Sequence, residues 1–478
     1  MKKIKADLFI KQFSSYTLFP DVVKRVIRKP YSVYLDGGSG QFESSRYSFL
    51  AVDPFLIFKC WGNRISLTDS DGERSLVADP FEYINSLVNS YEIDGDEQKV
   101  PFTGGAAGYI GYDMGRLIEE VPVTVKDDVD IPDAVLCLYG SVIIADHFKK
   151  ELFASASGLP ETGKALQKNK ALEDIDNLLS FADPSGLFNE GQDLDEGNEQ
   201  SILKSNFNRD DYVEAVKKVK KHIAMGDVYQ VNLSQRFTCE NNRSPFDVYN
   251  SLRKASPAPF SCFLNYADFH ILSSSPEGFL KFNQRQVETR PIKGTRPRGK
   301  TAVDDTRQKN DLLESAKDRA ELLMITDLER NDLGRVCKYG SIYPESLFGL
   351  ETYSNVFHLV SSIRGELVDG KRHVDGLKAC FPGGSITGAP KIRAMEIIEE
   401  LESCRRKIYT GAIGYFGFNK RSDFNIAIRT ILHKKGRYYF SVGGGIVADS
   451  DPEMEYEETL HKAKGMMAAL KASSTHEK

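Results

Sequence analysis

The chain has 478 residues, of which 41% are hydrophobic and 27% charged, and its formal net charge is -5. These values are ordinary for a globular protein with a large core, and they provide no basic field for nucleic acid. The most apolar window, residues 134–145, is interrupted and too short to span a bilayer, and no apolar run follows the basic start. We therefore expect a cytoplasmic protein that binds neither membranes nor nucleic acid. The seven cysteines are scattered and form no Cys-x-x-Cys pair, which argues against disulfides or a zinc site.

Residues 1–156 form a region rich in predicted strands. Segments 31–35, 46–52 and 55–61 combine β-branched and aromatic residues between Gly, Pro and Asp breaks. Residues 103–112 are dense in glycine but lack a dinucleotide fingerprint, so we expect them to serve close backbone packing.

Residues 157–208 form a predicted connection. A helix-like piece at 164–179 precedes an acidic, glycine-bearing run at 189–200, which cannot bury a core and indicates a flexible linker. We place the boundary between the N-terminal region and a catalytic region, residues 209–478, in this connection.

The third region alternates helices and strands. Apolar spacing and end signals predict helices over 211–225, 246–254, 311–336, 390–403 and 452–472, and strands over 228–234, 260–264 and 270–273. Residues 275–278 (Ser-Pro-Glu-Gly) form a predicted turn, and the stretch before the last helix is again rich in strands. The chain is therefore predicted to mix α and β structure.

The most unusual stretch is Glu288–Gly299, with Lys293 at its centre. Three arginines (Arg290, Arg296 and Arg298) lie close to this lysine, and two prolines stiffen the segment. Taken alone, it is most simply a basic surface loop, because lysines usually point into water.

Two predicted helices carry carboxylate pairs at helical spacing. Asp318 and Glu321 form the first i,i+3 pair, and Glu455 and Glu458 form the second, with Lys462 four residues further along. Each pair alone is commonly a solvated face. Together they suit Mg²⁺, a hard ion that takes carboxylate oxygens while keeping waters and substrate oxygens.

Glycine-rich turns supply candidate anion sites. Residues 382–391 run into a helix start, where exposed N–H groups favour an anion, but Gly388-Ala389-Pro390 excludes a nucleotide P-loop. The glycines at 443–445 end a predicted strand. Tyr409 and Arg429 lie on neighbouring strand-like segments and can hold a carboxylate through directed hydrogen bonds.

With these residues in view, the segment from about 205 to the end closely resembles the chorismate-utilising enzymes, and the first half resembles them more loosely. The matching blocks are residues 226–236, 275–277, 318–332, 358–361, 382–391, 409–415, 426–430 and 442–458. The resemblance implies an α+β fold: two lobes of largely antiparallel β-sheet flanked by helices, with the active site in the cleft.

The same resemblance implies roles for individual residues. Lys293 would add covalently at C2 of chorismate while Glu277 protonates the departing C4 hydroxyl, after which ammonia enters at C4. Glu321 and Glu458 would hold Mg²⁺ directly, with Glu455 and Asp318 acting through water. The substrate contacts would be Tyr409, Arg429, Thr295, His358, Ser385, Gly443, Gly445, Lys462 and Gln230. Lys293 must be neutral to react, and we expect burial beside Mg²⁺ and Arg296 to lower its pKa.

Lys293 and Gln230 distinguish branches of this family. Anthranilate synthase large subunits usually carry Ala where this chain has Lys293, whereas bacterial aminodeoxychorismate synthase large subunits carry Lys. Isochorismate and salicylate synthases use a lysine where this chain has Gln230, which argues against water as the nucleophile. The aminodeoxychorismate branch is therefore favoured, with anthranilate synthesis as the alternative.

Two further expectations follow from the resemblance. The chain shows no nucleophilic Cys in a glycine-rich elbow, so ammonia would be free or come from a separate glutamine amidotransferase subunit. Residues 34–38 (Tyr-Leu-Asp-Gly-Gly) replace the Leu-Leu-Glu-Ser of relatives that tryptophan inhibits, so we expect no tight tryptophan feedback.

Overall fold

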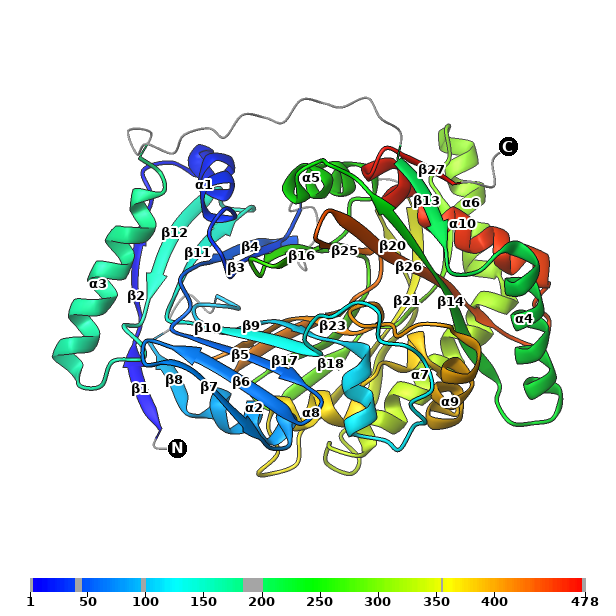
Figure 1. Ribbon diagram of the computed structural model, residues 1–478, viewed down its shortest axis with the longest axis horizontal. Helices are drawn as coiled ribbons and strands as arrows, with labels where there is room; N and C mark the ends of the chain where they lie inside the picture. Colours follow the sequence, from blue (N-terminus) through cyan, green and yellow to red (C-terminus); the bar gives the residue numbers. More distant parts are fainter. Residues whose placement is uncertain (1–2, 39–44, 96–99, 184–200, 354–355, 475–478) are drawn as a thin grey trace.

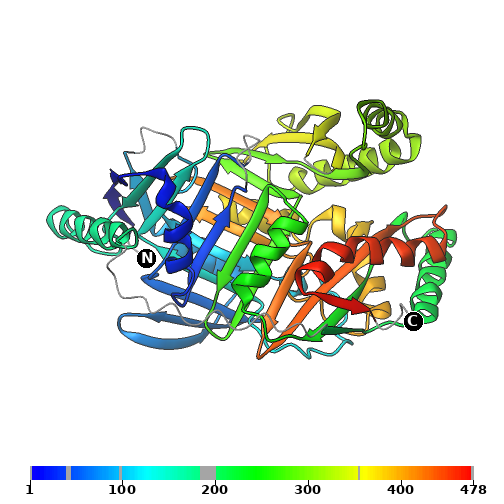
Figure 2. The ribbon, with the colours of Figure 1, turned by 90° about the horizontal axis from the view of Figure 1, so that it is seen from above.

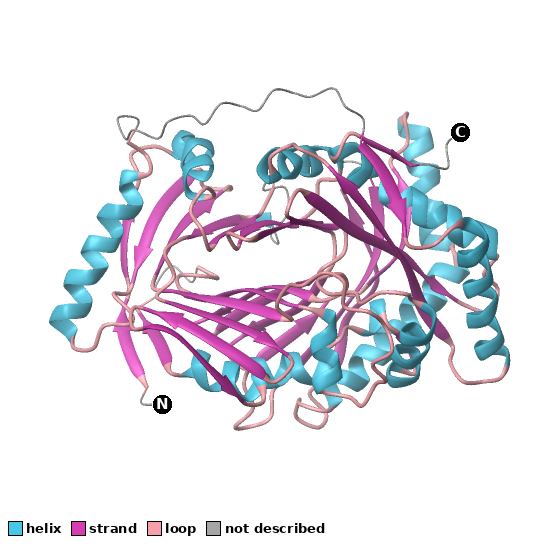
Figure 3. Cartoon of the chain, viewed as in Figure 1, coloured by secondary structure: helices cyan, strands magenta, loops and turns pink. Residues whose placement is uncertain are grey.

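The computed structural model describes residues 3–38, 45–95, 100–183, 201–353 and 356–474. Two large, mostly antiparallel β-sheets face each other, and helices cover their outer surfaces (Figures 1 and 3). The predicted α+β fold with antiparallel sheets flanked by helices is confirmed. Among the described residues, no helix is long and apolar enough to cross a membrane.

In the described part of the chain, the first sheet has twelve strands. In spatial order they are β19 (Ile292–Pro297), β21 (Val356–Glu366), β18 (Gln286–Thr289), β17 (Gly278–Asn283), β24 (Arg421–Ile426), β23 (Ala412–Gly417), β9 (Gly105–Ile110), β10 (Ala134–Tyr139), β5 (Leu56–Trp61), β6 (Arg64–Asp69) and β7 (Gly72–Val77), with β20 (Tyr343–Thr352) paired to β21.

Among the described residues, thirteen strands form the second sheet. Their order is β2 (Phe9–Gln12), β12 (Glu151–Ala156), β11 (Ser141–Asp146), β4 (Tyr47–Ala51), β3 (Ser32–Asp36), β15 (Phe260–Asn265), β16 (Phe269–Ser275), β25 (Thr430–Lys434), β26 (Arg437–Ile446), β14 (Gln230–Glu240), β13 (Ser201–Ser205) and β27 (Ala472–Ser474), with β22 (Gly388–Ala389) paired to β14. A small separate sheet pairs β1 (Ile4–Asp7) with β8 (Tyr91–Asp94).

Buried side chains fill three layers. Between the sheets, Phe49, Tyr109 and Leu264 belong to one apolar cluster. A second cluster packs helices such as α2 and α8 on the first sheet, and a third packs α1, α3, α5 and α10 on the second. The helices are α1 (Phe19–Val26), α2 (Pro80–Asn89), α3 (Lys164–Ser180), α4 (Arg209–Ala224), α5 (Pro245–Ala255), α6 (Ala302–Glu314), α7 (Ala316–Gly334), α8 (His373–Cys380), α9 (Lys391–Leu401) and α10 (Pro452–Ala469).

Both sheets combine strands from the start and the end of the chain. β9 pairs with β10 on one side and with β23 on the other, and β3 pairs with β15 (Figure 2). A Cβ on Gly108 would lie 2.0 Å from Val135 O, which confirms that glycines in residues 103–112 allow close backbone packing. The three-region division stays a prediction, and the acidic run at 189–200 lies outside the described residues.

The helix predicted over 311–336 is interrupted at Ser315. The Ser315 side chain accepts a hydrogen bond from Asp318 N, and its extended backbone ends α6 and begins α7. A serine followed three residues later by an acidic residue is a helix-start signal. The break sets the direction of α7, which carries Asp318 and Glu321 in its first turns.

Candidate active site

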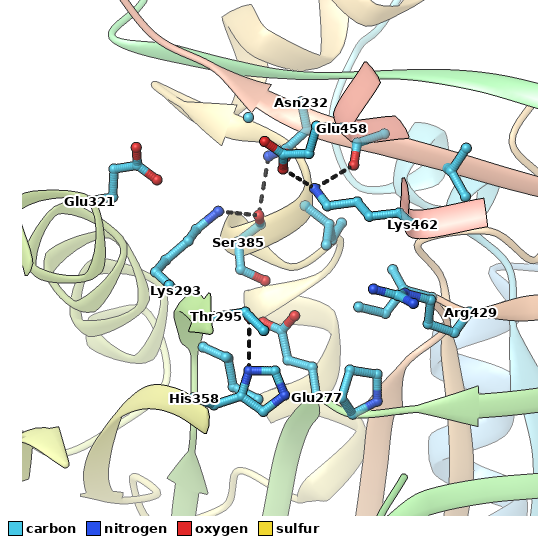
Figure 4. A pocket seen from close by; sticks show the side chains of 18 of the residues that line it. Asn232, Glu277, Lys293, Thr295, Glu321, His358, Ser385, Arg429, Glu458 and Lys462 are labelled. Atoms are coloured by element: carbon cyan, nitrogen blue, oxygen red, sulfur yellow. Dashed lines mark hydrogen bonds and ion pairs between the residues drawn. The ribbon is translucent and has the colours of Figure 1, made fainter. Parts of the chain in front are cut away.

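A cavity of about 650 Å³ lies where β19, β26, α7 and α10 meet the turns around Ser385 and Tyr409. The sequence-predicted residues that line it are Glu277, Lys293, Thr295, Asp318, Glu321, His358, Ser385, Tyr409, Arg429, Gly443, Gly445, Glu455, Glu458 and Lys462. The structure therefore brings together every predicted site residue except Gln230, from segments spread over almost two hundred positions of the chain. Figure 4 shows lining side chains around this space and labels ten of them, including Lys293 and Glu277.

Lys293 reaches the cavity from an irregular point of β19. The pairing of β19 with β21 shifts register between Lys293 and Thr295, and Gly294 at the bulge has φ 75°. A Cβ on Gly294 would lie 2.9 Å from Asp318 Cβ, so the glycine lets the lysine strand approach α7 closely.

The Lys293 ammonium donates to Ser385 O at 3.4 Å, as Figure 4 shows. Burial lowers the pKa of Lys293, although the nearby Glu277 and Glu321 carboxylates act in the opposite direction. Arg296 instead pairs with Asp311 at 2.5 Å and with Asp318 at 3.1 Å. The expected contribution of Arg296 to the Lys293 pKa is therefore wrong, and burial is the main cause.

Glu277 lies at the point where the chain passes from one large sheet to the other. It sits between β16 of the second sheet and β17 of the first, and only 6% of it is exposed. Burial raises the pKa of Glu277, against the opposing effects of Ser385 and Lys293. A carboxyl group that keeps its proton in a cavity beside a lysine of lowered pKa is suited to donate that proton.

Two helices place carboxylates on the same cavity. Glu321 on α7 and Glu458 on α10 both line it, and each is joined to a lysine: Glu458 to Lys462 at 2.7 Å and Glu321 to Lys317 at 3.9 Å. Burial raises the pKa of Glu321 and of Glu455, and neighbouring carboxylates raise both further. Burial acts to raise the pKa of Glu458 too, but nearby lysines outweigh it and the net pKa is lowered.

These carboxylates suit a hard divalent cation, because such an ion prefers oxygen ligands. The described residues contain no group of three or more His, Cys, Asp or Glu side chains close enough to hold a metal ion. The carboxylates would therefore have to approach one another and exchange their lysine partners for the cation. Burial is the main cause of the raised pKa values of Glu321 and Glu455, and a cation would relieve the repulsion from neighbouring carboxylates that adds to it.

Tyr409 and Arg429 lie in turns, not on strands as the sequence suggested. Tyr409 precedes β23, and Arg429 lies between β24 and β25 with φ 51°. Burial lowers the pKa of Arg429, and no described residue forms an ion pair with its guanidinium. An unpaired arginine facing a cavity is an anion site, and its planar donors match a carboxylate.

The remaining predicted contacts complete the wall of the cavity. The Thr295 hydroxyl and His358 Nδ1 are 2.9 Å apart, and burial lowers the pKa of His358 to about 4, so that ring is neutral. Gln230 does not line the cavity. It is fully buried beside Gly445, and both polar atoms of its amide lack a hydrogen-bond partner among the described residues.

The lining residues that were not predicted include Asn232, Lys317, Thr410 and His461. Asn232 donates to Ser385 O at 3.1 Å and lies two positions from Gln230 on β14. Lys317 is i,i+4 to Glu321, and His461 adjoins Lys462. Helical spacing from the predicted carboxylates could have identified Lys317 and His461.

Comparison with known proteins shows to which family this chain belongs. A family model described as chorismate binding enzyme matches residues 31–468. The chain is 39% identical to anthranilate synthase component 1 of Cereibacter sphaeroides (91% of this chain, 88% of that one). It is 36% identical to aminodeoxychorismate synthase component 1 of Bacillus subtilis (100% and 98%). The solved structure of anthranilate synthase component I from Streptococcus pneumoniae superposes with TM-score 0.77 at 33% identity (88% and 92%).

Proposed function

Because this chain belongs to the chorismate-binding enzyme family, we propose that it is a large subunit of aminodeoxychorismate synthase, which converts chorismate and ammonia to 4-amino-4-deoxychorismate. The relatives carry both names at similar identity, so overall similarity does not decide between them. The observation that carries the proposal is Lys293. Its amine lines the cavity together with the buried acid Glu277, and burial lowers its pKa.

The first half of the reaction uses Lys293 and Glu277 as a pair. The neutral Lys293 amine adds at C2, the two ring double bonds shift, and the C4 hydroxyl leaves as water with the proton that Glu277 supplies. The lysine nitrogen gives up one proton as the C–N bond forms, and this proton returns Glu277 to its acid form. No electron leaves the substrate, so the step needs no oxidant.

The second half reverses the double-bond shift. Ammonia adds at C4, the electrons return through the ring, and the C2–N bond to Lys293 breaks. The enolpyruvyl group stays on the ring, and the lysine is regenerated as a neutral amine because its nitrogen takes up one proton while the added ammonia loses one. The product is an amine at C4 in place of the hydroxyl, and no pyruvate is released.

Charged groups at opposite sides of the cavity would orient the dianionic substrate. Arg429, unpaired among the described residues, and Tyr409 would hold the enolpyruvyl carboxylate, assisted by backbone N–H groups near Gly445. Glu321 and Glu458 would hold Mg²⁺, with Glu455 and Asp318 as outer carboxylates. When bound, Mg²⁺ would grip the ring carboxylate and draw electron density from the diene.

The ammonia source is part of the proposal. The relatives are named component 1. We therefore propose that a separate glutamine amidotransferase subunit delivers ammonia to this chain, whereas high ammonium salt replaces that subunit in vitro.

Product analysis tests the proposal. The chain is incubated with chorismate, Mg²⁺ and ammonium salt, and the products are identified by mass. An amino product that retains the enolpyruvyl group is expected. Anthranilate with an equal amount of pyruvate would contradict the proposal and favour the activity named in the other relatives. If no turnover occurs, the assay is repeated with glutamine and an amidotransferase subunit.

A further inference from the structure

The segment that carries Tyr409 has a strained backbone. Lys407 and Thr410, on either side of Tyr409, have φ values of 51° and 61°, and Arg429 opposite them has φ 51°. Left-handed conformations at non-glycine residues are costly and persist only where the surroundings determine them. Both residues of the proposed carboxylate clamp, Tyr409 and Arg429, therefore depend on contacts that hold these turns.

Arg406 supplies such contacts with every donor it has. Its guanidinium donates to Glu402 Oε2 at 2.9 Å and Oε1 at 2.6 Å, and to Asn232 O at 2.7 Å. It also donates to Ile386 O at 3.1 Å and to the Thr410 hydroxyl at 3.3 Å. These five bonds match the five N–H groups of an arginine, and only 6% of the residue is exposed.

The contacts of Arg406 end on the cavity wall, but Arg406 itself does not line the cavity. Asn232, Ile386 and Thr410 all line it. The guanidinium also lies 5.7 Å from the ring centre of Tyr409. Arg406 therefore contacts three residues of the cavity wall without lining the cavity itself.

Glu402 extends the same network into the second sheet. Its Oε1 accepts from Ser234 N at 2.9 Å and from the Ser234 hydroxyl at 2.8 Å, and 5% of Glu402 is exposed. Through this carboxylate, the turn that bears Tyr409 is fixed to β14. Replacing a buried ion pair by apolar residues often costs no stability, so stability alone does not explain such a pair.

We propose that the Glu402–Arg406 pair positions the carboxylate clamp, so that losing it weakens substrate binding more than it slows chemistry. The proposal rests on the proposed function for the identity of the substrate. Lysine cannot replace Arg406, because an ammonium has three donors and no planar fork.

The test compares R406M with R405M as the matched control. Arg405 is the adjacent residue, and it pairs with the surface Asp127 at 3.4 Å. For R406M we expect the KM for chorismate to rise roughly ten- to hundredfold with a smaller change in kcat, because small misplacements of binding groups carry penalties of this size. R405M should keep the wild-type KM. Unfolding temperatures of all variants are measured alongside.

A second variant keeps the test decisive if R406M fails to fold. R406K keeps the positive charge and the apolar stem, and we expect its KM to lie between those of wild type and R406M. A wild-type KM in folded R406M or R406K would overturn the proposal and leave the pair a purely structural one.

Failure of the proposed function would look different. KM is measured from chorismate consumption, so an anthranilate product would overturn the proposed activity while the comparison of variants keeps its meaning. Chorismate binding measured by calorimetry gives the same comparison without turnover, and equal affinities of wild type and R406M would again refute the positioning role.

Discussion

Glu329 is a buried acid that titrates far from its usual range, and replacing it should change how stability depends on pH. It lies on α7, is 6% exposed, and accepts a hydrogen bond from the Thr289 hydroxyl. Burial, reinforced by the nearby charges of Glu277 and Asp332, raises the pKa of Glu329 from 4.5 to about 8. The folded protein therefore keeps a proton that the unfolded chain has already released.

The sign and size of the effect follow from this difference. Stability falls as the pH rises from 4.5 towards 8, because the unfolded state binds fewer protons over that range. The difference between pKa values of 4.5 and about 8 corresponds to a loss of at most about 5 kcal/mol in the free energy of unfolding. In E329Q the side chain is neutral at every pH, so this loss of stability should disappear. The stability of the variant relative to wild type should therefore increase as the pH rises.

Urea denaturation between pH 5 and pH 9 measures the effect. The free energy of unfolding of E329Q minus that of wild type should increase by several kcal/mol across this range (ceiling about 5 kcal/mol). E400Q is the control, because Glu400 is an exposed glutamate on α9. If E329Q and wild type lose stability in parallel, Glu329 is ionised in the folded protein and the reasoning is refuted.

Three further predictions concern the site. K293M should abolish turnover, while calorimetry should show that chorismate still binds. The activity of the wild type should rise with pH, with a midpoint below 10.5, because burial lowers the pKa of Lys293. E277Q should reduce kcat by roughly 10²- to 10⁴-fold, the usual contribution of a general acid, and should remove the loss of activity at high pH. E321Q and E458Q should each weaken Mg²⁺ binding, measured by calorimetry, by at least about tenfold, since both donors are carboxylates. Unchanged Mg²⁺ affinity in both would exclude these residues as ligands.

The sequence was informative where spacing is local. The carboxylate pairs at 318 and 321 and at 455 and 458 follow from helical periodicity, and both pairs line the cavity. The resemblance to chorismate-utilising enzymes indicated further residues that line the cavity and the fold, because ordered blocks of residues carry that information directly.

What could not be predicted depends on long-range pairing. Residues 105–110 pair with 412–417, a contact that no local pattern encodes, and this pairing joins the two ends of the chain in one sheet. The segments around Tyr409 and Arg429 resemble strands because their neighbours are apolar, yet both residues lie in turns. There, Thr410 N donates to Ala427 O and Ser274 N donates to Arg429 O. The break at Ser315 was predictable from its capping signal, but the apolar spacing on both sides hid it.

The most direct test of the account is the mass of the intact enzyme after mixing with chorismate and Mg²⁺ and rapid quenching, without ammonia. The account predicts a covalent adduct equal to chorismate less one water, mapped to Lys293 by peptide analysis and absent from K293M. An unmodified enzyme that nevertheless converts chorismate when ammonium is added would contradict it, because ammonia would then attack C4 without a lysine intermediate.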